Sequence, residues 1–162
     1  MDYSKIGEVK IPMEGYLREV LYNLPEEING RDETPVATQL FKVRSREGQV
    51  FLDKPRAHEF HHYVAKLLFT STICRKDIQT AVAFLTMRVK APDDDDWKKL
   101  LQLMQYIKCT IRLPLILSGD KLNIIKWWVD ASYAAHDDMC GNTGAIMSLG
   151  RGLVFSMSKN QN

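Results

Sequence analysis

Residues 124–131 read Ile-Ile-Lys-Trp-Trp-Val-Asp-Ala, and this apolar run decides the class of fold expected for the chain. Its branched and aromatic residues favour a β-strand. Residues 145–149 and 153–158 alternate large apolar with small or polar residues, and Gly150-Arg151-Gly152 between them is typical of a hairpin connection. Residues 113–162 are therefore predicted to form an antiparallel β-meander of three strands, with 113–117 as a candidate fourth.

Upstream of Arg112 the apolar residues recur with the 3.6-residue period of a helix. Amphipathic helices are predicted over residues 57–71, 76–89 and 93–109, and they are expected to pack together as a small bundle. Their expected buried stripes are Phe60, Val64, Leu67, Leu68 and Ser71, then Ile78, Ala81, Val82, Leu85 and Val89, then Trp97, Leu100, Leu101, Met104 and Ile107.

The first part of the chain is less regular. A short strand is expected over residues 6–11 and an amphipathic helix over 12–24. Residues 25–56 combine prolines and glycines with many charges, which predicts a linker or a segment that packs on something outside this chain. Residues 40–43 form its only apolar island, which is either a short strand or an anchor.

The fold class is therefore predicted to be α+β, in three parts. Residues 1–56 are the N-terminal helix and linker, residues 57–112 the three-helix bundle, and residues 113–162 the β-meander.

Composition limits the possible classes of protein. The chain has 162 residues, of which 45% are hydrophobic and 26% charged, values ordinary for a globular protein. No apolar run approaches the ~20 residues that a membrane span needs, and the first five residues lack an apolar signal segment. We therefore expect an intracellular protein without a membrane partner.

The charge is concentrated in the middle of the sequence. Residues 61–112 hold 9 Lys and Arg against 5 Asp and Glu, a net charge of +4, whereas residues 1–60 carry −2 and residues 113–162 carry 0. The basic middle part fits either a site for a polyanion or an ordinary solvated helix surface.

Several groups of titratable residues have a structural interpretation. The run 93–96 consists of four aspartates at a predicted helix start, where acids cap free N–H groups and favour the positive end of the helix dipole. His58 and His62 are four residues apart in the stretch His58-Glu59-Phe60-His61-His62 and share a helix face with metal-binding spacing, whereas exposed helix histidines are the alternative. His61 points elsewhere. The three cysteines, Cys74, Cys109 and Cys140, show no CxxC pairing and are expected to be free thiols.

Asp130 is the most informative acid, because it follows a strongly apolar strand. Carboxylates in that position hold Mg²⁺ in metal-dependent nucleases, whereas a strand-end Asp can also simply cap the following turn. Asp137 and Asp138, after His136, are expected to be turn formers. The sequence contains no phosphate-binding glycine fingerprint.

Four stretches together resemble the start of the RNase H domain of copia-type retrotransposon polyproteins. They are residues 128–133 (Trp-Val-Asp-Ala-Ser-Tyr), Asp137-Asp138, Thr143-Gly144 and Ser156-Met157-Ser158-Lys159. Upstream, residues 60–69, 75–84 and 96–110 resemble the connection helices of the reverse transcriptase in the same polyprotein, and residues 7–24 resemble the end of its polymerase domain. Lys76 replaces the proline of an Arg-Pro-Asp-Ile motif, Cys109 replaces the glycine of a Lys-Gly-Thr motif, and Lys159-Asn160-Gln161 departs from the family's Lys-Gln.

This resemblance implies a reverse transcriptase and an RNase H that cleaves RNA in RNA–DNA hybrids with Mg²⁺. Asp130 matches the first RNase H carboxylate and would be catalytic and a metal ligand. The matching sequence includes none of the other carboxylates, and one carboxylate does not organise two metals. We therefore expect a fragment with an incomplete RNase H-like sheet, no independent catalysis, and self-association through an open sheet edge. The alternatives are a nucleic-acid-binding module without cleavage and a purely structural remnant.

Overall fold

Helices and strands occupy separate parts of the chain, with one exception near its beginning. The computed structural model describes residues 1–35, 41, 43, 48–120, 124–132 and 142–160. The elements follow in the order β1 (Glu8–Ile11), α1 (Glu14–Tyr22), α2 (Lys54–Ile73), η2 (Lys76–Ile78, a 3-10 turn), α3 (Gln79–Arg88), α4 (Asp94–Cys109), β2 (Leu115–Gly119), β3 (Lys126–Ser132), β4 (Asn142–Ser148), β5 (Gly150–Arg151) and β6 (Phe155–Asn160). The predicted α+β class is confirmed.

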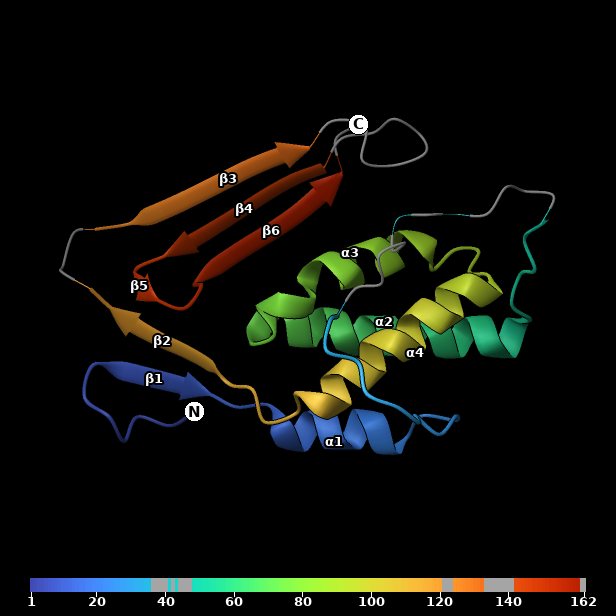
Figure 1. The fold of residues 1–162 in the computed structure, drawn as a ribbon, viewed down its shortest axis with the longest axis horizontal. Helices are drawn as coiled ribbons and strands as arrows, with labels where there is room; N and C mark the ends of the chain where they lie inside the picture. The colour runs from blue at the N-terminus through green and yellow to red at the C-terminus, as the bar shows by residue number, and fades with distance from the viewer. Residues whose placement is uncertain (36–40, 42, 44–47, 121–123, 133–141, 161–162) are drawn as a thin grey trace.

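The helices form one layer with a continuous apolar core. α2 contacts α3 and α4, and α1 packs against α4 (Figure 1). The buried apolar residues of this core are Leu17, Val20, Ile28, Phe60, Tyr63, Val64, Leu67, Ile78, Ala81, Val82, Phe84, Leu85, Trp97, Leu100, Leu103, Met104, Tyr106 and Ile107. The 3.6-residue period therefore located the core, with small shifts. Leu68, expected on the buried stripe of α2, is 46% exposed because the stripe is centred on Phe60, Tyr63, Val64 and Leu67.

The described part of residues 25–56 packs on the helices of this same chain, which differs from the expectation of a linker or of a partner outside the chain. Ile28 is buried in the core, and Phe41, Val43 and Leu52 pack against it. The Phe41 ring meets the edge of Phe84 at a centroid distance of 5.8 Å. The apolar island around Phe41 is therefore an anchor, because its side chains cover core surface that would otherwise face water.

The strands form two antiparallel sheets of three strands each among the described residues, in the orders β3-β4-β6 and β1-β2-β5. The first sheet is the predicted three-stranded meander. The expected candidate fourth strand, residues 113–117, does not join it, because β2 pairs with β1, with Val9 opposite Leu117. A period of two identifies a strand but not its partner, and β1, in which charged and apolar residues alternate, offers β2 an antiparallel edge.

The Gly150-Arg151-Gly152 turn connects β4 with β6, as predicted, and also joins the two sheets. Its two residues of β5 pair with the end of β2, with Arg151 opposite Ser118. Gly152 has a φ of +81°, and a Cβ atom at this position would overlap the carbonyl oxygen of Ile116. Glycine is therefore required by both conformation and space at this joint.

Candidate functional site

Asp130 lies in β3, directly opposite Gly144 of β4. Side chains alternate between the faces of a strand, so Asp130 shares its face with Trp128 and, on β6, with Ser158. Asp130 is exposed. The sequence therefore placed this residue correctly on an apolar strand, and the strand presents its carboxylate to solvent.

A groove of about 640 Å³ separates this sheet face from the start of α3. Its lining residues come from η2, α3, β3, β4, β6 and the turn before β6, and they are Lys76, Gln79, Thr80, Trp128, Val129, Asp130, Gly144, Ala145, Ile146, Leu153, Ser156, Met157 and Ser158. The Nε2 amide of Gln79 donates a hydrogen bond of 2.9 Å to the carbonyl oxygen of Ser156. This bond fixes α3 against β6, the strand of the sheet that lies nearest to it (Figure 1).

The groove offers mixed chemistry. Lys76 supplies a cation at one wall, Asp130 supplies an anion at the other, and the indole of Trp128 is 50% exposed. Burial lowers the pKa of Lys76, whose ammonium donates to the carbonyl oxygen of Thr72. The hydroxyl oxygen of Ser156 is buried and has no hydrogen-bond partner among the described residues. A cation, a flat aromatic ring and hydroxyls are groups that bind phosphates and stack on bases.

The described residues of the groove do not supply the carboxylates of the two-metal site that the resemblance implies. Asp130 is the one carboxylate among the described residues that line it. No group of three His, Cys, Asp or Glu side chains gathers anywhere in the described part of the chain. Asp137 and Asp138, predicted to be turn formers, lie outside the described residues. Two-metal catalysis needs several carboxylates around both ions, so no Mg²⁺-dependent step is assigned to Asp130.

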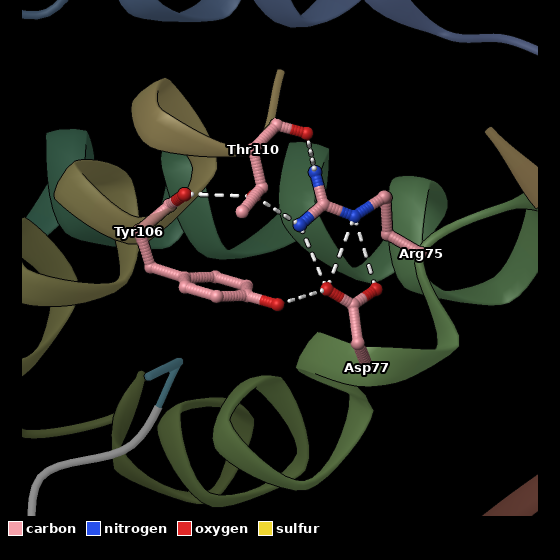
Figure 2. Close-up of polar contacts among 4 residues, drawn as sticks. All are labelled: Arg75, Asp77, Tyr106 and Thr110. Atoms are coloured by element: carbon pink, nitrogen blue, oxygen red, sulfur yellow. Dashed lines mark hydrogen bonds and ion pairs between the residues drawn. The ribbon is translucent and has the colours of Figure 1, made fainter. Parts of the chain in front are cut away.

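A second polar cluster surrounds the buried Arg75 between α2, η2 and α4, and we call it the Arg75 network (Figure 2). The guanidinium of Arg75, only 1% exposed, donates to both carboxylate oxygens of Asp77, with Nη2 at 2.7 Å from Oδ2. The same group donates to the side-chain and backbone oxygens of Thr110, at 2.7 and 3.2 Å. The Tyr106 hydroxyl donates to Asp77 at 2.8 Å. The network therefore ties the start of η2 to the end of α4.

The Arg75 network shifts the acidity of its members. Burial disfavours the charged form of Asp77, but the hydrogen bonds and charge of Arg75, with the Tyr106 hydroxyl, hold the pKa of Asp77 below its usual value. Burial, with the nearby Asp77 carboxylate, raises the pKa of Tyr106. A buried arginine that is satisfied by a carboxylate, a carbonyl and a hydroxyl stabilises the packing of helices.

The Arg75 network joins the two motifs that carried much of the resemblance. Arg75 and Asp77 belong to the Arg-Lys-Asp-Ile stretch, and Thr110 ends the Lys-Cys-Thr stretch. The two substituted positions do not enter it: Lys76 lines the groove, and Cys109 is exposed. Sequence reasoning did not foresee the contact. Its only signal was an Arg and an Asp two residues apart at a helix start, where a charge pair is also common on the surface.

The aspartate run is a helix cap, as predicted. Asp93 accepts from the backbone N–H groups of Asp95 and Asp96, and Asp96 accepts from that of Asp93, which completes a capping box at the start of α4. Arg88 donates to Asp96 at 2.9 Å and to Asp93 at 3.4 Å. Arg88 therefore pairs with both buried acids within the helical layer.

The other sequence candidates lie away from the groove. His58, His61 and His62 are exposed on α2. Cys74 is buried and donates to the carbonyl oxygen of Ile11 at 3.0 Å, and burial raises the pKa of its thiol. Cys140 lies outside the described residues.

Comparisons with protein-family models, curated proteins and solved structures give no significant match. None of the described helices is both long and apolar enough to cross a membrane.

Proposed function

We propose that this chain is part of a copia-type retrotransposon polyprotein, and that it binds nucleic acid, such as an RNA–DNA hybrid, in the groove beside Asp130 without cleaving it. It spans the connection region of the reverse transcriptase and the start of an RNase H-like domain. The site of action in this proposal is inside the cell, where the RNA–DNA intermediates of such an element occur.

The Arg75 network is the observation that carries the family assignment. Arg75 and Thr110 lie in motifs 35 positions apart, yet their side chains are hydrogen-bonded to each other at the edge of the helical core. Two weak motifs that meet in one hydrogen-bonded cluster support a common origin better than either motif alone.

The groove supports binding rather than catalysis. Lys76 can contact a phosphate, the half-exposed indole of Trp128 can stack on a base, and Thr80 and Ser158 bring hydroxyls to the same lining. One carboxylate, Asp130, is enough to orient a hydroxyl but not to hold the two ions that in-line hydrolysis requires.

The test uses a fluorescently labelled RNA–DNA hybrid in the presence of Mg²⁺, with anisotropy to measure binding and a denaturing gel to measure cleavage. We expect binding that weakens steeply with salt, and no cleavage. Lys76→Ala and Trp128→Ala are expected to weaken binding. The matched controls are Lys90→Ala, which removes one exposed lysine after the other end of α3, and Trp127→Ala, which removes the indole on the opposite sheet face.

Each alternative has its own result. Cleavage that disappears in Asp130→Asn would overturn the non-catalytic proposal. Absence of binding at low salt would leave a structural role. Equal loss in Lys76→Ala and Lys90→Ala would mean that binding depends on total charge and not on the groove.

A further inference from the structure

β3 has one unpaired edge in the part of the chain that the structure describes. It pairs with β4 on one side only, in the strand order β3-β4-β6. In Figure 1, β3 lies on the side of the sheet away from α3, and β6 lies nearest to α3. A seven-residue strand with one unpaired edge exposes a row of backbone donors and acceptors that another strand can pair with.

The sequence of β3 is complementary to itself in one antiparallel register. If Trp128 lies opposite Trp128 of a second copy, Lys126 lies opposite Asp130 of that copy, and Asp130 opposite its Lys126. The pairing thus forms two ion pairs related by a two-fold axis. A shift by two residues in either direction loses this symmetric double pairing.

The remaining pairs in this register are also complementary. Trp127 lies opposite Val129 of the second copy on the other sheet face, where both side chains are largely exposed, by 55% and 69%. Aromatic residues opposite branched ones, and opposite charges directly across, are the cross-strand pairs that stabilise antiparallel sheets. Lys126 already contacts Asp120, and an ammonium with three donors can bind both carboxylates.

We propose that the free edge of β3 pairs with β3 of a second copy of this chain, in the register that centres on Trp128, to form a continuous six-stranded sheet. The partner is a second copy because Lys126 and Asp130, the two charges of β3, complement each other when β3 pairs antiparallel with β3 of another copy. This inference rests on the strand edge and its charges and not on the proposed nucleic-acid binding, although Trp128 and Asp130 belong to both sites.

Charge exchange tests both the partner and the register. Sedimentation analysis of the full chain over a range of concentrations is expected to show a monomer–dimer equilibrium. Lys126→Asp places aspartates opposite each other, and Asp130→Lys places lysines opposite each other. Each variant alone is expected to raise the dissociation constant of the dimer at least about tenfold. An equimolar mixture of the two variants restores both ion pairs and is expected to form a heterodimer.

The matched control is Asp120→Asn, which removes the internal partner of Lys126 but leaves the edge unchanged, and is expected to dimerise as the parent chain does. Circular dichroism melts of each variant verify that the monomers are folded. The proposal is overturned if the parent chain is a monomer at all concentrations, or if the two folded single variants dimerise alone as well as they do when mixed. A dimer that resists both substitutions would place the contact elsewhere, which also overturns it.

Discussion

In α2, Phe60 and Leu67 are completely shielded from solvent, whereas in β3 Trp127 and Val129 expose more than half of their surface. The helical layer thus buries its apolar side chains within the chain, while the β3-β4-β6 sheet is held mainly by backbone pairing and by contact with α3. Buried apolar surface is the main source of folding free energy. The two regions therefore differ in role: the helices supply most of the folding free energy, and the sheet leaves apolar side chains exposed.

Paired phenylalanine truncations test this comparison most directly. Phe60→Ala removes a fully buried ring and is expected to lower the free energy of unfolding by about 4 kcal/mol, through lost transfer energy and a cavity. Phe155→Ala, on a ring of β6 that is 41% exposed, is expected to cost about 1 kcal/mol. Urea denaturation measures both. Equal losses would contradict the division of roles.

The Arg75 network gives the second-largest effect. Asp77→Asn leaves the buried guanidinium of Arg75 without its counter-charge and is expected to cost about 3 kcal/mol. Asp95→Asn, which weakens an exposed pair with Lys98, is the control and is expected to cost less than about 0.5 kcal/mol. Comparable losses in the two variants would mean that the buried network contributes little.

The Asp77 carboxylate also makes the stability of the chain depend on pH. Because the folded-state pKa of Asp77 lies below the unfolded value of 3.8, its contribution is complete above that value and is lost as the pH falls through the folded-state pKa. The parent chain is therefore expected to lose more stability than Asp77→Asn between pH 5 and the acid range, as measured by thermal melts in matched buffers. A steeper loss of stability at low pH in Asp77→Asn than in the parent chain would contradict this assignment.

The third-largest effect is expected at Gly152, in the turn that joins the two sheets. Gly152→Ala combines a left-handed φ with an overlap on Ile116 and is expected to cost about 2 kcal/mol. Gly7→Ala has nearly the same φ, +78°, but open space around the added methyl group, so its cost is expected to be about 1 kcal/mol. The difference between the variants, measured by denaturation, isolates the steric contact. No difference would indicate that the sheets are not held in register there.

The smallest effect is expected at the start of α4. Asp93→Ala removes the side-chain cap and is expected to cost about 1 kcal/mol, whereas Asp94→Ala next to it removes no cap and is expected to cost a few tenths at most. Thermal melts compare the two. A larger loss for Asp94→Ala would mean that charge, and not the capping geometry, sets the helix start.

The helical layer was predictable because its information is local. The 3.6-residue spacing of residues such as Val64, Leu85 and Leu100 located the helices and most of the core. Strand positions were predictable in the same way, but the pairing of β2 with β1 was not, because alternation contains no information on which distant strand is the neighbour. The Arg75 network was missed for a related reason. Its members come from separate elements, and their burial depends on how those elements pack.

Of the candidate site, the sequence located Asp130 but not the groove in which it lies. The sequence pattern placed Lys76 and Thr80 on a helix, and the packing of α3 on β6, which includes the hydrogen bond from Gln79, brings them opposite the sheet. Sites formed between a helix and a sheet depend on tertiary contacts of this kind, which no local pattern records.

The pairing of β1 with β2 also constrains the order of folding. Glu8 of β1 lies opposite Ser118 of β2, and the whole helical layer lies between them in the chain. Closing so long a loop before the helices have packed is entropically unfavourable, so this sheet is expected to form late. On the ribosome, β1 emerges before β2 and has no β2 to pair with until that strand has been synthesised, and docking of α1 on α4 then brings the two strands together.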